Sequence, residues 1–332
     1  MIILGAIVYV IAGRFEKRRN SSSPGVVVER EVLSRDEPET MVMPDGTTYA
    51  RRFRVSTLLL IGTDLQEENE EEMDMFPTRN GGQADFLLLL AEDDEYHRFV
   101  PILIDRDTMT EISVTNIMGK PSGSRIAQIC LSYAFGTDDT DSCLHTGEAV
   151  SGLLTGVPVN HYMSLKMENI PVVNDAVGGV TVKIVDDLTA SDPSLVRGTT
   201  VTLSGKQAEA YLRARMTVGS GTNVERMERQ KVYMEAFLEQ VQVGLASQGY
   251  EYLEKMLNTI YDVTLTDMSS DTLLDHLWKR KDYIWEDMVQ IKGEHKIGEE
   301  GFMEFYPDEN DLKETVCRIF YEKYTGDSYD FM

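Results

Sequence analysis

TLLLIGTD at residues 57–64 and ADFLLLLAE at 84–92 decide the fold of this 332-residue chain, and RFVPILIDRDT at 98–108 extends the pattern. Each run is short, almost continuously apolar and bounded by polar residues, which is typical of strands buried on both faces of a sheet. Helical patterns alternate with strand patterns further along, in GEAVSGLLTG, MENIPVVNDAVGG and GKQAEAYLRARM. The alternation predicts an α/β fold.

A long amphipathic helix is predicted over residues 223–246. Its apolar side chains fall on one stripe when successive residues are about 100° apart. Thr222 and Glu225 have the spacing of a capping box, which places the start of the helix in GTNVERMERQK at 221–231. The stripe consists of Met227, Met234, Phe237, Leu238, Val241 and Leu245.

The charge of the chain is strongly negative, with a formal net charge of -24 from 56 acidic and 32 basic residues. This argues against nonspecific nucleic-acid binding, which depends on phosphate neutralisation by Lys and Arg. Arginines nevertheless gather around the start of the predicted helix. A helix N-terminus gains no dipole stabilisation from arginine but favours anions, so these residues indicate a local anion site. Ion pairs with Glu225 and Glu228 are the alternative interpretation. The arginines are Arg213, Arg215, Arg226 and Arg229.

Aspartates stand at the ends of the predicted strands, where ligands of α/β sheets tend to bind. Asp64 ends the first run, Asp85 begins the second, and Asp105-Arg106-Asp107 closes the third. Carboxylates converging from neighbouring strands can hold Mg²⁺, which completes its coordination with phosphate oxygens and water. Ordinary surface turns are the alternative.

The N-terminal segment, MIILGAIVYVIAG, is shorter than the roughly 20 apolar residues needed to span a bilayer. We interpret it as the trimmed end of a membrane anchor, with a poor signal peptide or a hydrophobic strand as alternatives. The basic residues that follow it do not fit an anchor that exports the rest of the chain. The predicted organisation is an anchor remnant at 1–13, a linker and lead-in at 14–50, an α/β domain at 51–246 and a helical C-terminal extension at 247–332.

Several features have a structural interpretation. The acidic stretch at 66–82 is expected to be a solvated surface loop, with a cation-binding loop as the alternative. Cys130, Cys143 and Cys317 show no zinc-site spacing and are expected to be core thiols, although a Cys130–Cys143 disulfide stays open. His161 is expected to be a packed strand residue. The chain contains no GxxxxGK[ST], strand-GxGxxG-helix or GxSxG motif.

Eight sequence blocks in register resemble the LytR-CpsA-Psr family of bacterial cell-envelope transferases. The resemblance covers about residues 55–245, and TDMSSDTLLDHL and EFYPDENDLKETVCRIF resemble the family's C-terminal extension. It implies a mixed central sheet flanked by helices on both sides, with an apolar pocket for a prenyl chain. The blocks are IGTD, ADFLLLL, IDRDTMTEI, LSYAFG, LLTGVPVNHYMSLK, VVNDAVGGVTVKI, LSGKQAEAYLRARM and NVERMERQ.

The resemblance also implies an activity and a location. Members of the family transfer glycopolymers, such as teichoic acid or capsular polysaccharide, from an undecaprenyl-diphosphate carrier to peptidoglycan. They are held by one N-terminal membrane helix, with the catalytic domain outside the cytoplasmic membrane. We therefore expect a single-pass protein of the bacterial cell membrane, with a prenyl-linked glycan as donor and peptidoglycan as acceptor.

The matching motifs imply site residues in this chain. Asp64 and Asp85 resemble the ligands of Mg²⁺. Asp107 is a candidate base, and Arg106 and Arg226 are expected to act in catalysis. The implied diphosphate-binding set is Arg106, Arg213, Arg215, Arg226, Arg229 and Gln230.

Two positions depart from the family's pattern. Gln83 stands where the family usually has an arginine, for which Arg79 could compensate, and Asn223 stands where it usually has an aspartate. The insertion at 66–82 also lengthens the connection between the two expected metal ligands. These departures leave a second hypothesis open, a non-catalytic member that binds prenyl-linked glycan or a regulatory partner.

Overall fold

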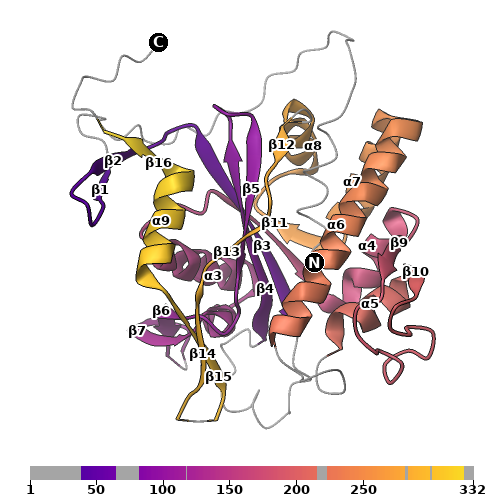
Figure 1. Cartoon of the computed structure of the whole chain (residues 1–332), viewed down its shortest axis with the longest axis horizontal. Helices are drawn as coiled ribbons and strands as arrows, with labels where there is room; N and C mark the ends of the chain where they lie inside the picture. Colours follow the sequence, from indigo (N-terminus) through magenta and orange to yellow (C-terminus); the bar gives the residue numbers. More distant parts are fainter. Residues whose placement is uncertain are drawn as a thin grey trace.

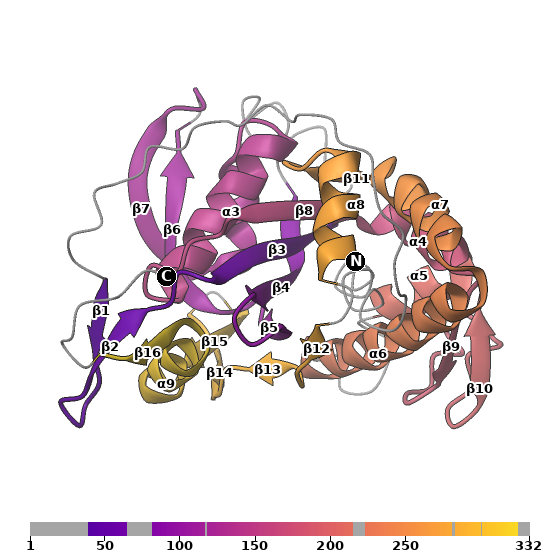
Figure 2. The ribbon, with the colours of Figure 1, turned by 90° about the horizontal axis from the view of Figure 1, so that it is seen from above.

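The chain forms three layers, with helices on both faces of one central sheet (Figure 1; Figure 2). The structure is a computed structural model. It describes residues 39–64, 82–116, 118–214, 223–280, 283–299 and 301–324. For residues 223 and 224 it describes the backbone but not the side chains.

The three apolar runs form adjacent antiparallel strands of the central sheet, as expected. They are β3 (Val55–Asp64), β4 (Gln83–Asp93) and β5 (Arg98–Ile104). The strand order is β11-β8-β3-β4-β5-β12, and β13 also pairs with β5. Because β8 runs parallel to β3, and β12 and β13 run parallel to β5, the sheet is mixed. The remaining strands are β8 (His161–Lys166), β11 (Thr264–Thr266), β12 (Ile284–Trp285) and β13 (Val289–Gln290).

Two apolar cores lie on opposite faces of the sheet, which explains why its strands are apolar at successive positions. Leu58 and Leu60 face one core, while Leu59 and Ile61 face the other. The first core is covered by α4 (Ile170–Ala176), α5 (Gly205–Arg213), α6 (Asn223–Gln248), α7 (Tyr250–Tyr261), α8 (Ser270–Lys279) and the short η3 (Met167–Asn169). The second is covered by η2 (Ile129–Phe135), α3 (Asp139–Leu153) and α9 (Glu309–Phe320).

Smaller sheets surround these layers and revise two expectations. The lead-in at 14–50 contains strands that pair with the end of the chain, and the C-terminal extension is not only helical, because it supplies strands to three sheets. These strands are too short for hydrophobic periodicity to reveal them. The small sheets comprise β1 (Thr40–Val42), β2 (Thr48–Arg51) and β16 (Tyr321–Lys323); β6 (Met109–Thr115) and β7 (Pro121–Gln128); β9 (Val180–Lys183) and β10 (Thr200–Leu203); and β14 (Gly293–Ile297) and β15 (Met303–Pro307).

The cysteines, His161 and the expected membrane anchor are the remaining features predicted from the sequence. All three cysteines are buried free thiols, so Cys130 and Cys143 form no disulfide. His161 begins β8, as expected of a strand residue, and it is half-buried: 36% of its side chain is exposed, and its Nδ1 lies 3.0 Å from Asp267 Oδ2. Within the described ranges, no helix is long and apolar enough to cross a membrane. The expected anchor, the capping residue Thr222 and nearly all of the acidic insertion lie outside the described residues.

Candidate active site

An irregularity in strand pairing places Asp85 at the end of the central sheet. Gly62 pairs with Phe86 but Thr63 pairs with Ala84, so Asp85 is the extra residue of a β-bulge on β4. The bulge shifts the alternation of the strand, since Phe86 packs in the core beneath α6 and Ala84 packs in the opposite core. Bulges of this kind re-aim a side chain and are common beside active sites.

Two buried arginines converge on Asp85 from distant parts of the chain. Arg106, just after β5, contacts Asp85 Oδ1 through Nη1. Arg226, in the first turn of α6, donates from Nη2 to the carbonyl oxygen of Asp85 at 3.1 Å, and its Nη1 lies 3.7 Å from Asp85 Oδ2. The three residues are 2–7% exposed. The structure therefore brings together three residues that the sequence assigned to one site.

Further contacts hold Arg106 in place but leave one of its donors unused. Its Nη2 donates to Gln83 Oε1 and lies 3.1 Å from the sulfur of Cys130. Burial raises the pKa of the Cys130 thiol, which keeps it neutral. Among the described residues, Nε of Arg106 has no hydrogen-bond partner, although Asp107 Oδ1 lies 3.6 Å away. An incompletely satisfied buried guanidinium is unusual in a folded protein and suits an anion site. No sequence signal pointed to Cys130.

A tight turn at residues 105–108 carries Arg106. Asp105 Oδ1 accepts a hydrogen bond from the amide of Asp107 at 2.9 Å, and its carbonyl accepts from the hydroxyl of Thr108 at 2.6 Å. Asp107 Oδ1 accepts from Gln128 Nε2 at 3.3 Å. The hairpin β14–β15 closes over this turn, and His295 Nε2 lies 2.8 Å from Asp105 Oδ2. Sequence reasoning missed His295, because 190 residues separate it from its partner.

Asp64 and Arg213 form a second pair at the same end of the sheet. Asp64 of β3 pairs with Gln83 of β4, and Gln83 precedes Asp85 by two residues. Arg213 Nη2 contacts Asp64 Oδ1, and its Nη1 lies 2.7 Å from Glu209. The side chains of Asp64 and Arg213 are 33% and 39% exposed, so this pair is open to solvent. Arg215 lies outside the described residues.

Arg229 has a different set of partners. It is 1% exposed, and its Nη1 lies 2.8 Å from Asp186 Oδ2. Its Nε donates to the carbonyl of Tyr211 at 3.3 Å, and its Nη2 donates to that of Ala214. These contacts fasten α6 to the end of α5. Gln230 is likewise buried, at 2% exposure. Donor binding by Arg229 and Gln230 stays a prediction.

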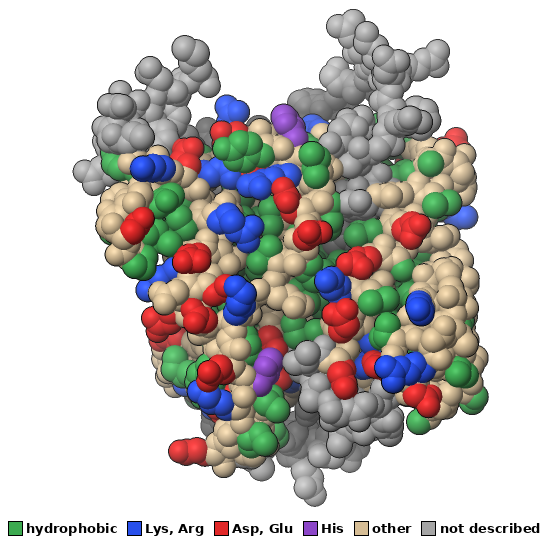
Figure 3. Space-filling model, in the orientation of Figure 1, with side chains coloured by type: hydrophobic (Ala, Val, Ile, Leu, Met, Phe, Trp, Pro, Cys, Tyr) green, Lys and Arg blue, Asp and Glu red, His purple; other side chains and the backbone are tan. Residues whose placement is uncertain are grey.

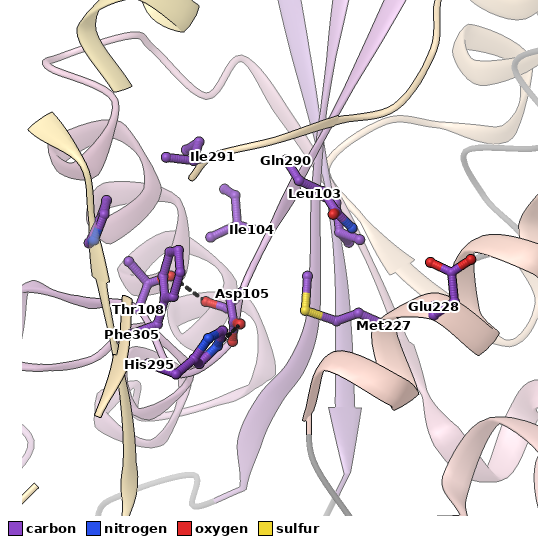
Figure 4. Close-up of a pocket in the computed structure, with 11 residues that line it drawn as sticks. Leu103, Ile104, Asp105, Thr108, Met227, Glu228, Gln290, Ile291, His295 and Phe305 are labelled. Atoms are coloured by element: carbon purple, nitrogen blue, oxygen red, sulfur yellow. Dashed lines mark hydrogen bonds and ion pairs between the residues drawn. The ribbon is translucent and has the colours of Figure 1, made fainter. Parts of the chain in front are cut away.

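A pocket of about 180 Å³ lies beside this cluster. Figure 4 shows His295 and Phe305 next to Asp105, with Met227 of α6 across from them. Figure 3 shows acidic and basic side chains interspersed over one face of the molecule. The arginines of the cluster outweigh the net negative charge of the chain in the binding of an anion. An opposite charge at 4 Å contributes about 4 kcal/mol at an effective dielectric of 20, whereas exposed charges beyond about 8 Å are largely screened.

The match to a family model decides the relationship of this chain to known proteins. Residues 28–318 match the LytR_cpsA_psr family. The chain belongs to this family. Among the site residues that the family's motifs imply for this chain, Asp85, Arg106 and Arg226 form the buried cluster, and Asp64 lies at the same end of the sheet.

Relatives of this LytR-CpsA-Psr protein include transferases. The protein named polyisoprenyl-teichoic acid–peptidoglycan teichoic acid transferase TagU is 27% identical in Bacillus anthracis over 278 residues, which is 83% of this chain and 80% of that protein. The protein of the same name from Bacillus mycoides is 27% identical over 76% of this chain and 74% of its own length. The crystal structure of Bacillus subtilis TagV is 21% identical and has a TM-score of 0.61 over 80% of this chain and 97% of TagV, which supports the fold.

Proposed function

We propose that this chain transfers a glycopolymer of the teichoic acid or capsular polysaccharide type from an undecaprenyl-diphosphate carrier to peptidoglycan. The observation that carries the proposal is the convergence of Arg106 and Arg226 on Asp85 at the end of the sheet. Arginine pairs with phosphate oxygens through two parallel N–H bonds, so two buried guanidinium groups suit a diphosphate. The names of the relatives further support the proposal.

The reaction is a phosphoryl transfer. A sugar hydroxyl of peptidoglycan attacks the sugar-linked phosphorus, and the bond to the bridging oxygen breaks. Its electron pair leaves with the prenyl phosphate. Arg106 and Arg226 bind and orient the diphosphate and neutralise the charge that develops on its oxygens, so catalysis consists mainly of positioning and charge stabilisation.

Two carboxylates fit a role in holding Mg²⁺. Asp64 and Asp85 supply hard oxygen ligands from neighbouring strands, and Oδ1 of Asp85 has no hydrogen bond among the described residues, although it contacts Arg106. Those residues contain no group of three or more His, Cys, Asp or Glu suited to a metal, so further ligands would come from phosphate and water. When bound, Mg²⁺ would neutralise part of the donor's phosphate charge.

A prenyl-linked donor also places the proposed reaction at a membrane surface. We further propose that the N-terminal residues anchor the protein in the membrane and that its α/β domain lies outside the cytoplasm. An apolar pocket would hold the prenyl chain of the donor.

Turnover of purified components tests the activity. The folded protein is incubated with Mg²⁺, a prenyl-diphosphate-linked glycan and peptidoglycan oligomers. We expect prenyl phosphate to be released in step with glycan attachment to the oligomers. Natively folded protein that neither cleaves the diphosphate nor transfers the glycan would contradict the proposal.

Metal dependence is a separate prediction. Chelation by EDTA should abolish transfer and added Mg²⁺ should restore it. Asp64→Asn should raise the Mg²⁺ concentration required for half-maximal activity by at least about 10- to 100-fold, the loss that follows in other metal sites when only an outer-shell partner of a ligand is changed. Asp187→Asn, at an exposed turn, is the control because the hydrogen bonds of Asp187 within the described part of the chain are local ones, to Thr189. An unchanged Mg²⁺ requirement in Asp64→Asn would remove Asp64 from the metal site.

The contact between Gln83 and Arg106 favours testing the second hypothesis, a non-catalytic binding protein. In this chain Gln83 accepts a hydrogen bond from the very arginine expected to bind the donor. The double change Gln83→Arg and Asn223→Asp restores the family's residues. A gain of transfer only in the double variant would support the non-catalytic interpretation, and equal turnover by the unmodified chain would refute it.

A further inference from the structure

The pocket beside the arginine cluster is lined by both polar and apolar side chains. Three carbonyl- or carboxylate-bearing side chains, an imidazole and an aromatic ring meet there with aliphatic groups (Figure 4). Asp105 and Met227, which line it, are the immediate chain neighbours of Arg106 and Arg226. The pocket therefore adjoins the proposed diphosphate site on two elements at once. Its polar lining includes Asp105, Thr108, Glu228, Gln290 and His295.

The contact with Asp105 determines which nitrogen of His295 is basic. A carboxylate accepts hydrogen bonds, and Nε2 of His295 lies 2.8 Å from Asp105 Oδ2, so Nε2 carries the proton in the neutral ring. Nδ1 then holds the lone pair, and among the described residues it makes no hydrogen bond. The ring is also fixed by Phe305, whose centroid lies 4.7 Å away, while 30% of the side chain remains exposed.

We propose that this pocket binds the acceptor sugar and that His295 is the general base of the transfer. The inference rests on the proposed function. The acceptor oxygen forms a bond to the sugar-linked phosphorus, its proton passes to His295 Nδ1, and the electron pair of the broken phosphorus–oxygen bond leaves with the prenyl phosphate. Asp105, whose Oδ2 lies 2.8 Å from Nε2 of His295, stabilises the imidazolium that forms.

The geometry favours His295 over Asp107, which the family resemblance made a candidate base. Asp107 is 5% exposed, its Oδ1 accepts from Gln128, and the same oxygen lies 3.6 Å from Nε of Arg106. A carboxylate beside a guanidinium is a weak base because the positive charge favours its ionised form. His295 is more accessible, because 30% of its side chain is exposed and its contact with Asp105 is made through Nε2, which leaves Nδ1 for the acceptor.

Two substitutions separate a base from a residue that only positions the turn. His295→Gln retains an N–H donor for Asp105 but has no basic nitrogen, whereas His295→Ala loses both. We expect each variant to lower the rate of transfer about 100- to 10,000-fold, the range typical of general base catalysis. Added imidazole should restore part of the activity of His295→Ala. Wild-type activity in His295→Gln, or no response to imidazole, would overturn the proposal.

The control is His161→Gln, because His161 also pairs with an aspartate, Asp267, but lies on β8 outside this pocket. Its transfer rate should match that of the unmodified protein. If the control loses as much activity as His295→Gln, the effect is not specific to the pocket and the proposal is wrong.

A measurement without turnover distinguishes failure of this inference from failure of the proposed function. Nitrogen-15 imidazole spectra of the full chain should show His295 protonated at Nε2, and titration with N-acetylglucosamine should shift the Nδ1 signal. Such a shift in a protein that transfers no glycan would support the acceptor pocket and refute the wider activity. A ring protonated at Nδ1 instead, or no shift at saturating sugar, would overturn the inference even if transfer occurs.

Discussion

Arg226 combines a role in stability with a role in binding, and its substitution must separate the two. It is 2% exposed and contacts both the backbone and the carboxylate of Asp85. Deleting one partner of a buried pair typically destabilises a protein by about 3–5 kcal/mol. Arg226→Ala would therefore confound loss of function with loss of folding.

Arg226→Lys is the sharper test. Lysine keeps the positive charge beside Asp85 but lacks the planar fork that binds two phosphate oxygens. We expect transfer to fall about 100-fold, as when one donor to a developing oxyanion is removed, with native circular dichroism retained. Lys231→Arg, on the same helix, is the control. Equal transfer rates in the two variants would show that bidentate binding by Arg226 is unnecessary.

Residues of the candidate site were predictable where a charged side chain stands out against its neighbours in the sequence. Asp85 begins an apolar run, Arg106 follows one, and Arg226 lies at the start of a helix, where helix stability gives arginine no advantage. The bulge that turns Asp85 toward the arginines was not predictable, because it depends on the pairing of two strands. Cys130 and His295 contact the site only through tertiary packing.

Among the elements, length decided what could be predicted. The strands β3, β4 and β5 are buried on both faces over 7–11 residues, which leaves a clear apolar signal. Strands β12 and β13 have two residues each and pair with β5, which lies far away in the sequence. Their pairing is set by packing rather than by local pattern.

The close approach of α4 and α5 gives a test of this packing. A Cβ on Gly205 would lie 2.7 Å from the Cα and the carbonyl oxygen of Pro171. Gly205→Ala must therefore push the two helices apart, and we expect a loss of about 1–3 kcal/mol in the free energy of unfolding. Gly152→Ala, in α3, is the matched control.

The control, Gly152→Ala, is expected to stabilise the protein. A Cβ on Gly152 meets nothing within 4 Å, so alanine there should raise the free energy of unfolding by about 0.4–1 kcal/mol. Urea denaturation measures both values. Equal stability of the two variants would show that α4 and α5 are not in tight contact.

Over the whole molecule, one buried ion pair network joins both ends of the described chain to the sheet. Arg52, after β2, binds Asp93 of β4 through two hydrogen bonds of 2.6 and 2.8 Å. Its Nη1 also donates to the carbonyl of Ile319 in α9 at 3.2 Å, and Arg98 of β5 donates to Asp93 at 3.0 Å. Asp93 thus joins the residue after β2 to the central strands β4 and β5, and Arg52 joins the same cluster to α9.

This network predicts a specific dependence of stability on pH. Burial alone would raise the pKa of Asp93, but hydrogen bonds from Arg52 and Arg98 outweigh burial and lower it below its usual value of 3.8. The stabilisation is therefore fully present above pH 3.8 and is lost as the pH falls through the lower pKa of the folded state. Unfolding free energies measured in urea should decline steeply in this acidic range.

Asp93→Asn should remove this contribution and change the pH profile. Asparagine has nearly the same shape but leaves the buried guanidinium of Arg52 without its full counter-charge, so we expect a loss of about 3–5 kcal/mol at pH 7. The variant should also lose less stability than the wild type below pH 3.8, because it has no carboxylate to protonate at this position. Asp275→Asn breaks an exposed pair with Lys279 and should change stability by less than about 1 kcal/mol. Similar losses in the two variants at pH 7, or parallel pH profiles for Asp93→Asn and the wild type, would show that the shared carboxylate does not hold the ends of the chain to the sheet.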